Sequence, residues 1–145
     1  MTATTYANLR DNVQSTVFTL LSGDTNVTTL CSHIIDGTPL KLTKERGFPY
    51  IVVNTPTARH DNFVIANSKF DQNISLRITV ASFKESAVRQ VADAVINSLK
   101  TNQATTKAAN LNWFKINNTS LTPFTLDNGD IAYFYEIDVG YKFTG

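Results

Sequence analysis

The chain has 145 residues and a net charge of +1, with 42% apolar and 17% charged residues. This length predicts one domain, residues 1–145, that can bury a core without metals or disulfides. The near-zero charge excludes a global field that would hold nucleic acid or a membrane. Neither a leader pattern nor an apolar run of about 18 residues occurs, so we expect no signal peptide and no membrane span.

Two helices are predicted at the start of the chain. The first runs from Tyr6 to Leu21, on an apolar stripe with helical spacing that ends before Gly23. Asp24 has the position of an N-cap for a second, short helix, whose apolar face is Val27, Leu30, Cys31 and Ile34 at helical spacing. The only cysteine, Cys31, cannot form an internal disulfide and is expected to be a core thiol.

One strand between two loops is predicted in the next part of the chain. Leu40 to Gly47 is a basic loop. Phe48 to Asn54 is a strand with little alternation, so it should lie centrally or be covered on both faces, with Pro49 at its start. Thr57 to Gln72 is long and polar, and we interpret the region 55–72 as an extended loop or hairpin arm.

The segment Asn73 to Lys100 predicts a strand that runs directly into a helix. Apolar and polar residues alternate up to Val80, which is the period of a half-buried strand. From Val88 to Leu99 the apolar residues recur at helical spacing. Ser82 and Glu85 have the spacing of a capping box at the junction. We expect this unit to lay a helix across one face of a mainly antiparallel sheet.

The last third of the chain predicts strands after a polar linker, Thr101 to Ala109. Leu111 to Ile116 is a strand that carries the only tryptophan. Thr122 to Leu126 is a second extended segment, in which Pro123 indicates a sheet edge. Asp127 to Asp130 contains Asn-Gly between extended segments, which predicts a hairpin. Ile131 to Phe143 alternates over roughly 43 Å, so it should extend past its own core or bend at Gly140. The elements predict an α+β fold: a mainly antiparallel (mixed) sheet with one long C-terminal strand and helices packed on one face.

No constellation typical of an enzyme or a metal site occurs in the sequence. His60-Asp61 is the only adjacent pair of a histidine and an acid, and two histidines with one cysteine are too few for a typical zinc site. Glu136 and Asp138 share a strand face, which favours a solvated face over a catalytic carboxylate pair. We therefore expect no enzymatic activity and no cofactor.

The densest basic cluster joins Lys41, Lys44 and Arg46 with Arg59 and His60. It is interpreted either as a solvated loop or as a contact with an acidic protein or passing nucleic acid. No aromatic side chain is interleaved with it for base stacking. With aromatic residues of the kind enriched at interfaces, the candidate subunit or partner interface comprises Lys41, Lys44, Arg46, Arg59, His60, Phe63, Tyr141 and Phe143.

A succession of structural segments extends from about Tyr6 to Phe143. It comprises Leu20–Asp24, Val27–Leu30, His33–Pro39, Gly47–Val53, a strand ending at Ser82, the helix Val88–Leu99, and the long closing strand. This order resembles the tail terminator (tail-completion) proteins of long-tailed bacteriophages. The loops Leu40–Gly47 and Thr57–Gln72 are longer than the family pattern, and the pattern contains no catalytic residues to carry over.

That resemblance implies a virion protein that assembles in the host cytoplasm as a ring, usually a hexamer, at the head-proximal end of the tail tube. The implied ring stops tube polymerisation, contacts the tail tube protein and the head–neck connector protein, and lets DNA pass without sequence-specific binding. Two alternatives stay open. One is a head-closure or connector neck protein of the same virion. The other is a small-ligand or peptide-binding α+β module with its aromatic strand face as a pocket wall.

Overall fold

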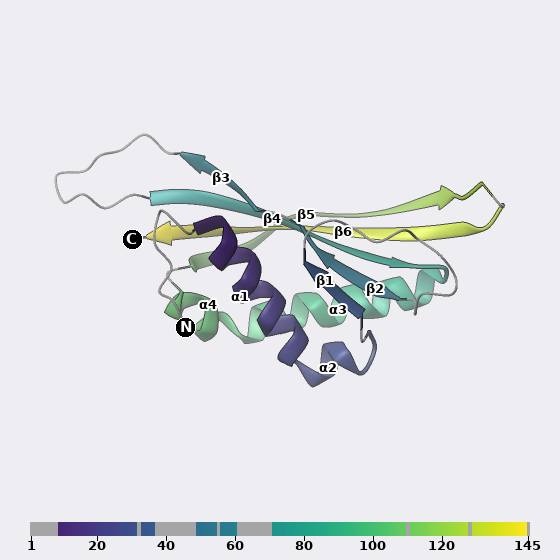
Figure 1. The fold of residues 1–145 in the computed structure, drawn as a ribbon, viewed down its shortest axis with the longest axis horizontal. Coiled ribbons are helices and arrows are strands. Elements are labelled where there is room, and N and C mark those ends of the chain that lie inside the picture. The colour runs from purple at the N-terminus through teal and green to yellow at the C-terminus, as the bar shows by residue number, and fades with distance from the viewer. Residues whose placement is uncertain are drawn as a thin grey trace.

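The structure, a computed structural model, describes residues 9–31, 33–36, 49–54, 56–60, 71–109, 111–127 and 129–144. Its elements are, in chain order, α1 (Leu9–Gly23), α2 (Thr25–Thr28), β1 (His33–Asp36), β2 (Tyr50–Val53), β3 (Thr57–His60), β4 (Asp71–Ser82), α3 (Glu85–Thr101), α4 (Gln103–Ala108), β5 (Leu111–Thr125) and β6 (Ile131–Thr144). The helices lie on one side of the sheet (Figure 1). The predicted α+β class is therefore confirmed.

Within the described ranges, six strands form one mixed sheet. Five follow the order β1-β2-β4-β6-β5, and β3 pairs with β4 outside this path. β1 and β2 are parallel, whereas the other described pairs are antiparallel. The long strand β6 therefore lies between β4 and β5 and pairs with both.

The predicted strand–helix unit is confirmed as β4 and α3. In β4, polar residues that are exposed or half-buried alternate with buried apolar residues. The buried residues are Ile74, Leu76, Ile78 and Val80. The buried residues of α3 have helical spacing and include Val88, Val91, Ala92, Val95 and Leu99. Because α3 contacts both β4 and β6, this apolar layer holds the two central strands against one helix.

The junction between β4 and α3 differs from the predicted capping box. The N-cap is Lys84, which makes no side-chain cap bond, and the helix begins at Glu85. Glu85 is thus the first helical residue, too early to reach back to a cap from the third position. It pairs with Arg89 one turn later, at 2.6 Å. The Ser82 hydroxyl accepts a hydrogen bond from the Lys84 N–H at 3.3 Å.

The N-terminal helices agree with the prediction in kind and differ in extent. α1 continues to Gly23. Asp24 caps α2 as predicted, since its carboxylate accepts a hydrogen bond from the Asn26 N–H at 2.9 Å. α2 ends at Thr28, and the chain enters β1 at His33. This four-residue strand corrects the prediction that the second helix reaches Ile34, and it is too short to show a period of its own.

The segment predicted as a polar linker after α3 instead contains helix α4. Thr106 of this helix is buried, and its hydroxyl donates to the Gln103 carbonyl at 3.0 Å. Ala109, just after it, is buried too. A threonine that satisfies its hydroxyl within its own helix can be buried without any hydrophobic signal in the sequence.

Strand β2 lies in the sheet as the prediction requires. All four of its residues are buried, and its neighbours are β1 on one side and β4 on the other. Pro49 precedes it, so the missing proline N–H removes no bond from the ladder.

Strands β5 and β6 form one hairpin that extends past the helices (Figure 1). They have 15 and 14 residues, so β5 joins the predicted extended segments Leu111–Ile116 and Thr122–Leu126 in one strand. Pro123 lies in β5 at the sheet edge, where a proline is tolerated. The predicted turn is confirmed: the Leu126 N–H donates to the Asp130 carbonyl at 2.8 Å. Gly129 has a φ of +88°, which glycine adopts without strain.

The irregularity expected at Gly140 lies across the ladder, in β5. β6 stays in register with β4 through Gly140, whereas β5 shifts register between Asn112 and Lys115 and again between Ile116 and Asn118. A Cβ on Gly140 would lie 2.9 Å from the Asn117 side-chain nitrogen. Glycine thus makes room for a side chain of the irregular neighbouring strand.

Candidate interaction surface

In the described chain, four large hydrophobic residues are exposed: Leu30, Trp113, Phe124 and Ile131. Three of the four lie on the β5–β6 hairpin. Single exposed apolar residues are common, but tryptophan and phenylalanine are enriched where proteins meet partners. The hairpin is therefore the candidate interaction surface.

Trp113 is 78% exposed and has a φ of 56°, a left-handed conformation that large side chains rarely adopt. It lies in the first irregular stretch of β5, between Asn112 and Lys115. The next residue, Phe114, packs on the buried ring of Tyr141, with 5.5 Å between ring centroids. A β-bulge can redirect a side chain, and here one aromatic ring faces the core while its neighbour faces solvent.

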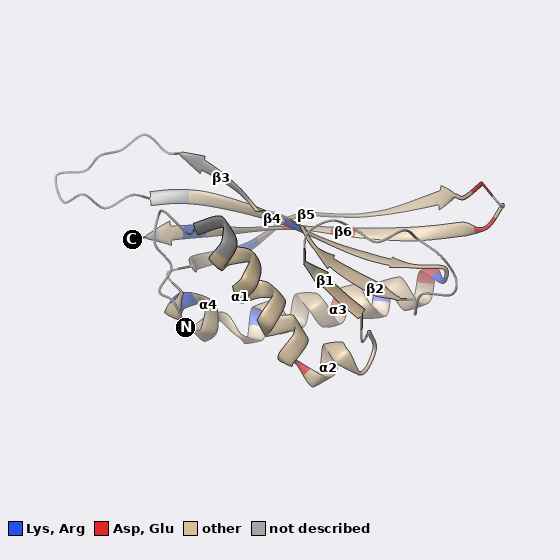
Figure 2. Ribbon diagram, in the orientation of Figure 1, with Lys and Arg blue, Asp and Glu red and all other residues tan. Residues whose placement is uncertain are grey.

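The turn end of the hairpin combines apolar and acidic side chains. Phe124 is 55% exposed and Ile131 is 47% exposed. Phe124 also meets Phe134 edge to face, with 6.3 Å between ring centroids. Asp127 and Asp130 flank the turn and give this end its negative charge (Figure 2).

Basic residues lie at and near the other end of the hairpin (Figure 2). Lys115 lies opposite Gly140, and Lys142 lies opposite Asn112, on the same face of the ladder. Lys107 belongs to α4, which packs against β5. Lys107 and Lys115 are exposed. The hairpin therefore carries opposite charges at its two ends.

The open face of the sheet, opposite the helices, holds an ion cluster near its centre. Arg77 of β4 places Nε 2.8 Å from Asp138 Oδ1 and Nη1 3.1 Å from Glu136 Oε2 of β6. The hydrogen bond to Asp138 and the negative charge of Glu136 raise the pKa of Arg77. The face predicted as solvated is thus a partly exposed ion cluster, which orients three side chains more than it stabilises the fold.

Six of the eight predicted interface residues have side chains outside the described part of the chain. Four lie outside the described residues: Lys41, Lys44, Arg46 and Phe63. Arg59 and His60 belong to β3, where they pair with Asn73 and Gln72 of β4, and their side chains lie outside the described part. Residues 61–70 lie outside it too. The hairpin arm at 55–72 and the basic cluster therefore stay predictions.

Tyr141 and Phe143 are core residues, which corrects the prediction that their rings face a partner. They are 3% and 1% exposed, because β6 turns this face toward the helices. The Tyr141 hydroxyl is buried and finds no hydrogen-bond partner among the described residues. Burial raises the pKa of Tyr141. The exposed aromatic residues of the described chain are Trp113 and Phe124.

Cys31 is a core thiol, as predicted. It is 2% exposed, and its Sγ donates to the carbonyls of Pro49 at 3.2 Å and His33 at 3.4 Å. Burial raises the pKa of the thiol to about 11, so Cys31 is protonated at neutral pH. A protonated, buried thiol is a poor nucleophile.

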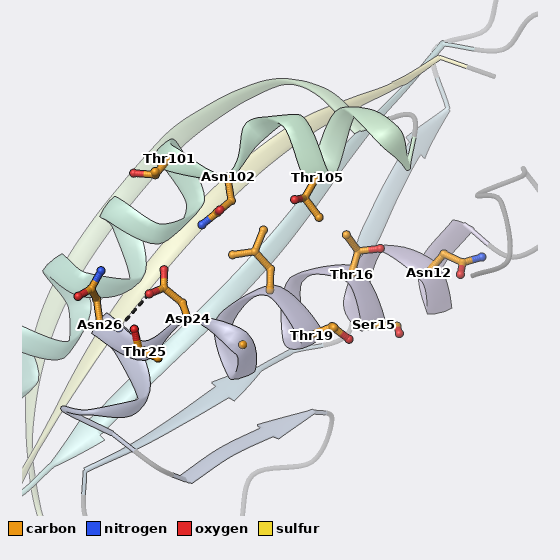
Figure 3. Close-up of a pocket in the computed structure, with 12 residues that line it drawn as sticks. Asn12, Ser15, Thr16, Thr19, Asp24, Thr25, Asn26, Thr101, Asn102 and Thr105 are labelled. Atoms are coloured by element: carbon orange, nitrogen blue, oxygen red, sulfur yellow. Dashed lines mark hydrogen bonds between the residues drawn. The ribbon is translucent and has the colours of Figure 1, made fainter.

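A groove of about 640 Å³ lies where α1, the start of α2, the end of α3 and α4 meet (Figure 3). Its walls are rich in hydroxyl and amide side chains, among them Ser15, Thr16, Thr19, Thr101, Asn102 and Thr105. Its one carboxylate, Asp24, already caps α2. The predicted ligand-binding alternative placed its pocket on the aromatic face of the last strand, and no residue of that strand lines this groove.

Within the described ranges, His, Cys, Asp and Glu nowhere gather in threes as a metal site would need. None of the described helices has the length and apolar character required to cross a bilayer. The exposed aromatic and charged side chains of the hairpin thus define the candidate surface.

Comparison with known proteins relates the fold to two solved structures. Neither a protein-family model nor a curated protein sequence matches the chain. The chain is similar to one in the virion of a native gene transfer agent particle, with a TM-score of 0.68 and 12% identity over 97% of this chain and 100% of that chain. It is also similar to the gp17 protein of bacteriophage SPP1, with a TM-score of 0.54 and 13% identity over 97% and 95% of the two chains. At these identities the likeness shows a shared fold.

Proposed function

We propose that this chain is a structural subunit of a tailed bacteriophage or a related particle. The observation that carries the proposal is the fold shared, over nearly the full length of both chains, with a component of a gene transfer agent virion. The similarity to a protein of bacteriophage SPP1 supports it independently. An exposed aromatic hairpin on a rigid scaffold also suits a subunit that works by contact.

Within such a particle, the proposed position is the head-proximal end of the tail tube. Six copies form a ring there, stop tube polymerisation and join the tail to the head–neck connector protein. One face of the ring matches the growing end of the tube. The other face does not resemble a tube subunit, so no further subunit can add. This role needs no catalysis and no cofactor, and assembly takes place in the host cytoplasm.

The proposed ring leaves a channel through which DNA passes without sequence-specific binding. The net charge of +1 supports this, because a strongly basic lining would retain the phosphate backbone. The layer formed by α3 with β4 and β6 supplies the rigidity that such a channel requires. The β5–β6 hairpin is then free to contact neighbouring subunits.

A head-closure or connector protein of the same virion is the second candidate. The gene transfer agent comparison names a whole virion and no position within it, so it supports any subunit of that particle. The two candidates differ in their partner. A terminator binds the end of the tail tube, whereas a connector protein binds the head side and leaves tube growth unchanged.

The direct test is polymerisation of a tail tube protein from the same particle, with and without the purified chain. We expect shorter tubes and a ring at one end of each tube in negative-stain electron microscopy. Light scattering should give the mass of six chains for the isolated or tube-released ring. Tubes of unchanged length with bare ends would contradict the terminator role and favour the connector.

A hairpin deletion provides the matched control. Phe124 and Ala132 lie opposite each other in the ladder, so residues 125–131 can be replaced by Asn-Gly with the strands still in register. We expect this variant to keep its circular dichroism spectrum, because the helix-covered part of the sheet is untouched. It should no longer shorten the tubes. Retained capping would exclude the hairpin as the working surface.

A further inference from the structure

We propose that the β5–β6 hairpin joins successive copies of this chain head to tail. The acidic turn end of one hairpin docks on the basic, Trp113-bearing end of the next copy's hairpin. This inference rests on the proposed ring and specifies the contact that builds it. The partner surface is therefore a second copy of this chain.

Each end of the hairpin exposes large apolar side chains that the other end could cover. Trp113 is 78% exposed at one end, while Phe124 and Ile131 are 55% and 47% exposed at the other. Tryptophan is the side chain that most often dominates an interface when its ring is covered. A left-handed φ on so large a residue costs conformational energy. A contact made by the displaced ring offsets that cost.

The charges complement each other as the apolar residues do. Asp127 and Asp130 carry the charge of the turn end, and Lys115, Lys142 and Lys107 carry that of the other end. Asp127 and Lys115 are both exposed, and neither forms an ion pair in the described part of the chain. Opposite charges across an interface set orientation and exclude the reversed register.

The two ends cannot satisfy each other within one molecule. Trp113 and Phe124 lie toward opposite ends of the same strand, roughly 35 Å apart at about 3.3 Å per residue. A contact between them is therefore intermolecular. Because the two patches differ, it is a head-to-tail contact, which produces a closed ring when the rotation per subunit closes.

The first test uses Trp113 as its own reporter, since it is the only tryptophan. We expect its fluorescence emission to shift to the blue as concentration and light-scattering mass rise together. Trp113→Ala should weaken association about thirtyfold, the loss typical of a hot spot. Its melting curve should stay close to wild type, because the ring touches little of its own chain.

The second test exchanges the charges. Asp127→Lys alone and Lys115→Glu alone should each weaken association about tenfold, because each places like charges in contact. Mixing the two variants in equal amounts should restore association, since every contact then pairs opposite charges. The double variant in one chain should also assemble. Asp93→Lys, exposed on α3, is the matched control and should assemble normally.

The outcomes separate this contact from the proposed function. Assembly with unchanged tryptophan emission, or with both single charge variants intact, would overturn the contact and leave the ring in place. A chain that stays monomeric at all concentrations, both alone and on tube ends, would overturn the ring and the contact together. Restoration on mixing, with each variant weakened when alone, would establish the contact.

Discussion

Strand β6 pairs with two long strands, β4 and β5, whose side chains differ in how far they are buried. On one flank, β4 alternates buried and exposed residues. On the other flank, Leu111 is the only buried residue of β5. Ile137 of β6 shows the contrast directly: it faces Ile78 in β4 and Thr119 in β5. Ile78 is fully buried, whereas Thr119 is exposed.

The difference shows that a strand can pair fully in this sheet without contributing to the hydrophobic core. Backbone pairing alone contributes modestly to stability, because the unfolded chain bonds equally well to water. Apolar packing under α3 is what distinguishes the β4 flank. The β5 flank can therefore carry exposed aromatic side chains, Trp113 and Phe124, without loss of core packing.

The largest expected effect compares the two partners of Ile137. Ile78→Ala should cost about 3 kcal/mol of unfolding free energy, because it leaves a cavity in the core. Thr119→Ala should change it by less than about 0.5 kcal/mol, as exposed positions do. Urea denaturation followed by circular dichroism measures both. Similar losses for the two variants would show that the β5 flank carries core energy after all.

A smaller effect is expected on β6 itself. Tyr141→Phe should raise the unfolding free energy by about 1 kcal/mol, because it removes a buried hydroxyl that finds no partner among the described residues. The half-buried Tyr133→Phe serves as the control and should be nearly neutral. A loss of stability in Tyr141→Phe would mean that the hydroxyl has a partner, such as a buried water.

The same substitution should alter the response to alkali. Burial raises the pKa of Tyr141 above its ordinary value of 10.0, so above pH 10 the unfolded chain releases this proton while the folded chain keeps it. Stability of the wild type should therefore fall as pH rises above 10. The advantage of Tyr141→Phe should grow over that range, as thermal melts between pH 9 and 11 would measure. A constant difference would contradict the buried hydroxyl.

On the open face, the ion cluster should matter little. Arg77→Ala should cost about 0.5 kcal/mol, because the side chain is half exposed and solvent screens its pairs. The cost should shrink in about 1 M salt. Ser120→Ala on the β5 flank, opposite Glu136, is the reference. A loss above about 2 kcal/mol that salt does not change would make the cluster part of the fold's stability.

The smallest expected effect lies at the bulge of β5. Trp113→Asn should leave stability unchanged or raise it by a few tenths of a kcal/mol, since asparagine tolerates a positive φ better than tryptophan does. A thermal melt of the monomeric variant measures this. A clear loss of stability would show that the indole of Trp113 packs on its own chain and is not available to contact a partner.

The parts of the fold with a strong period were predictable, and those without one were not. The alternation in Asn73–Val80 and the stripe in Val88–Leu99 predicted β4 and α3 because their burial is one-sided. Helix α4 was missed because its buried Thr106 satisfies its hydroxyl locally. The full length of β5 was missed because an exposed edge strand needs no alternation, only a partner to pair with.

The candidate surface was harder to predict for a related reason. The long last strand drew attention to the hairpin, but its aromatic residues Tyr141 and Phe143, which were predicted to face a partner, belong to the core. Which of two adjacent aromatics, Trp113 or Phe114, faces solvent depends on a bulge. A bulge is a register property of two strands, and one strand's sequence does not encode it.

If the two ends of the hairpin join consecutive subunits, the length of the hairpin sets the radius of the proposed ring. In a hexagon the side equals the radius, so roughly 35 Å of strand between Trp113 and Phe124 would set a ring radius of roughly 35 Å. Strand faces alternate, so only paired insertions preserve the docking residues. The bore for DNA would then change in increments of roughly 7 Å of radius, two residues at a time.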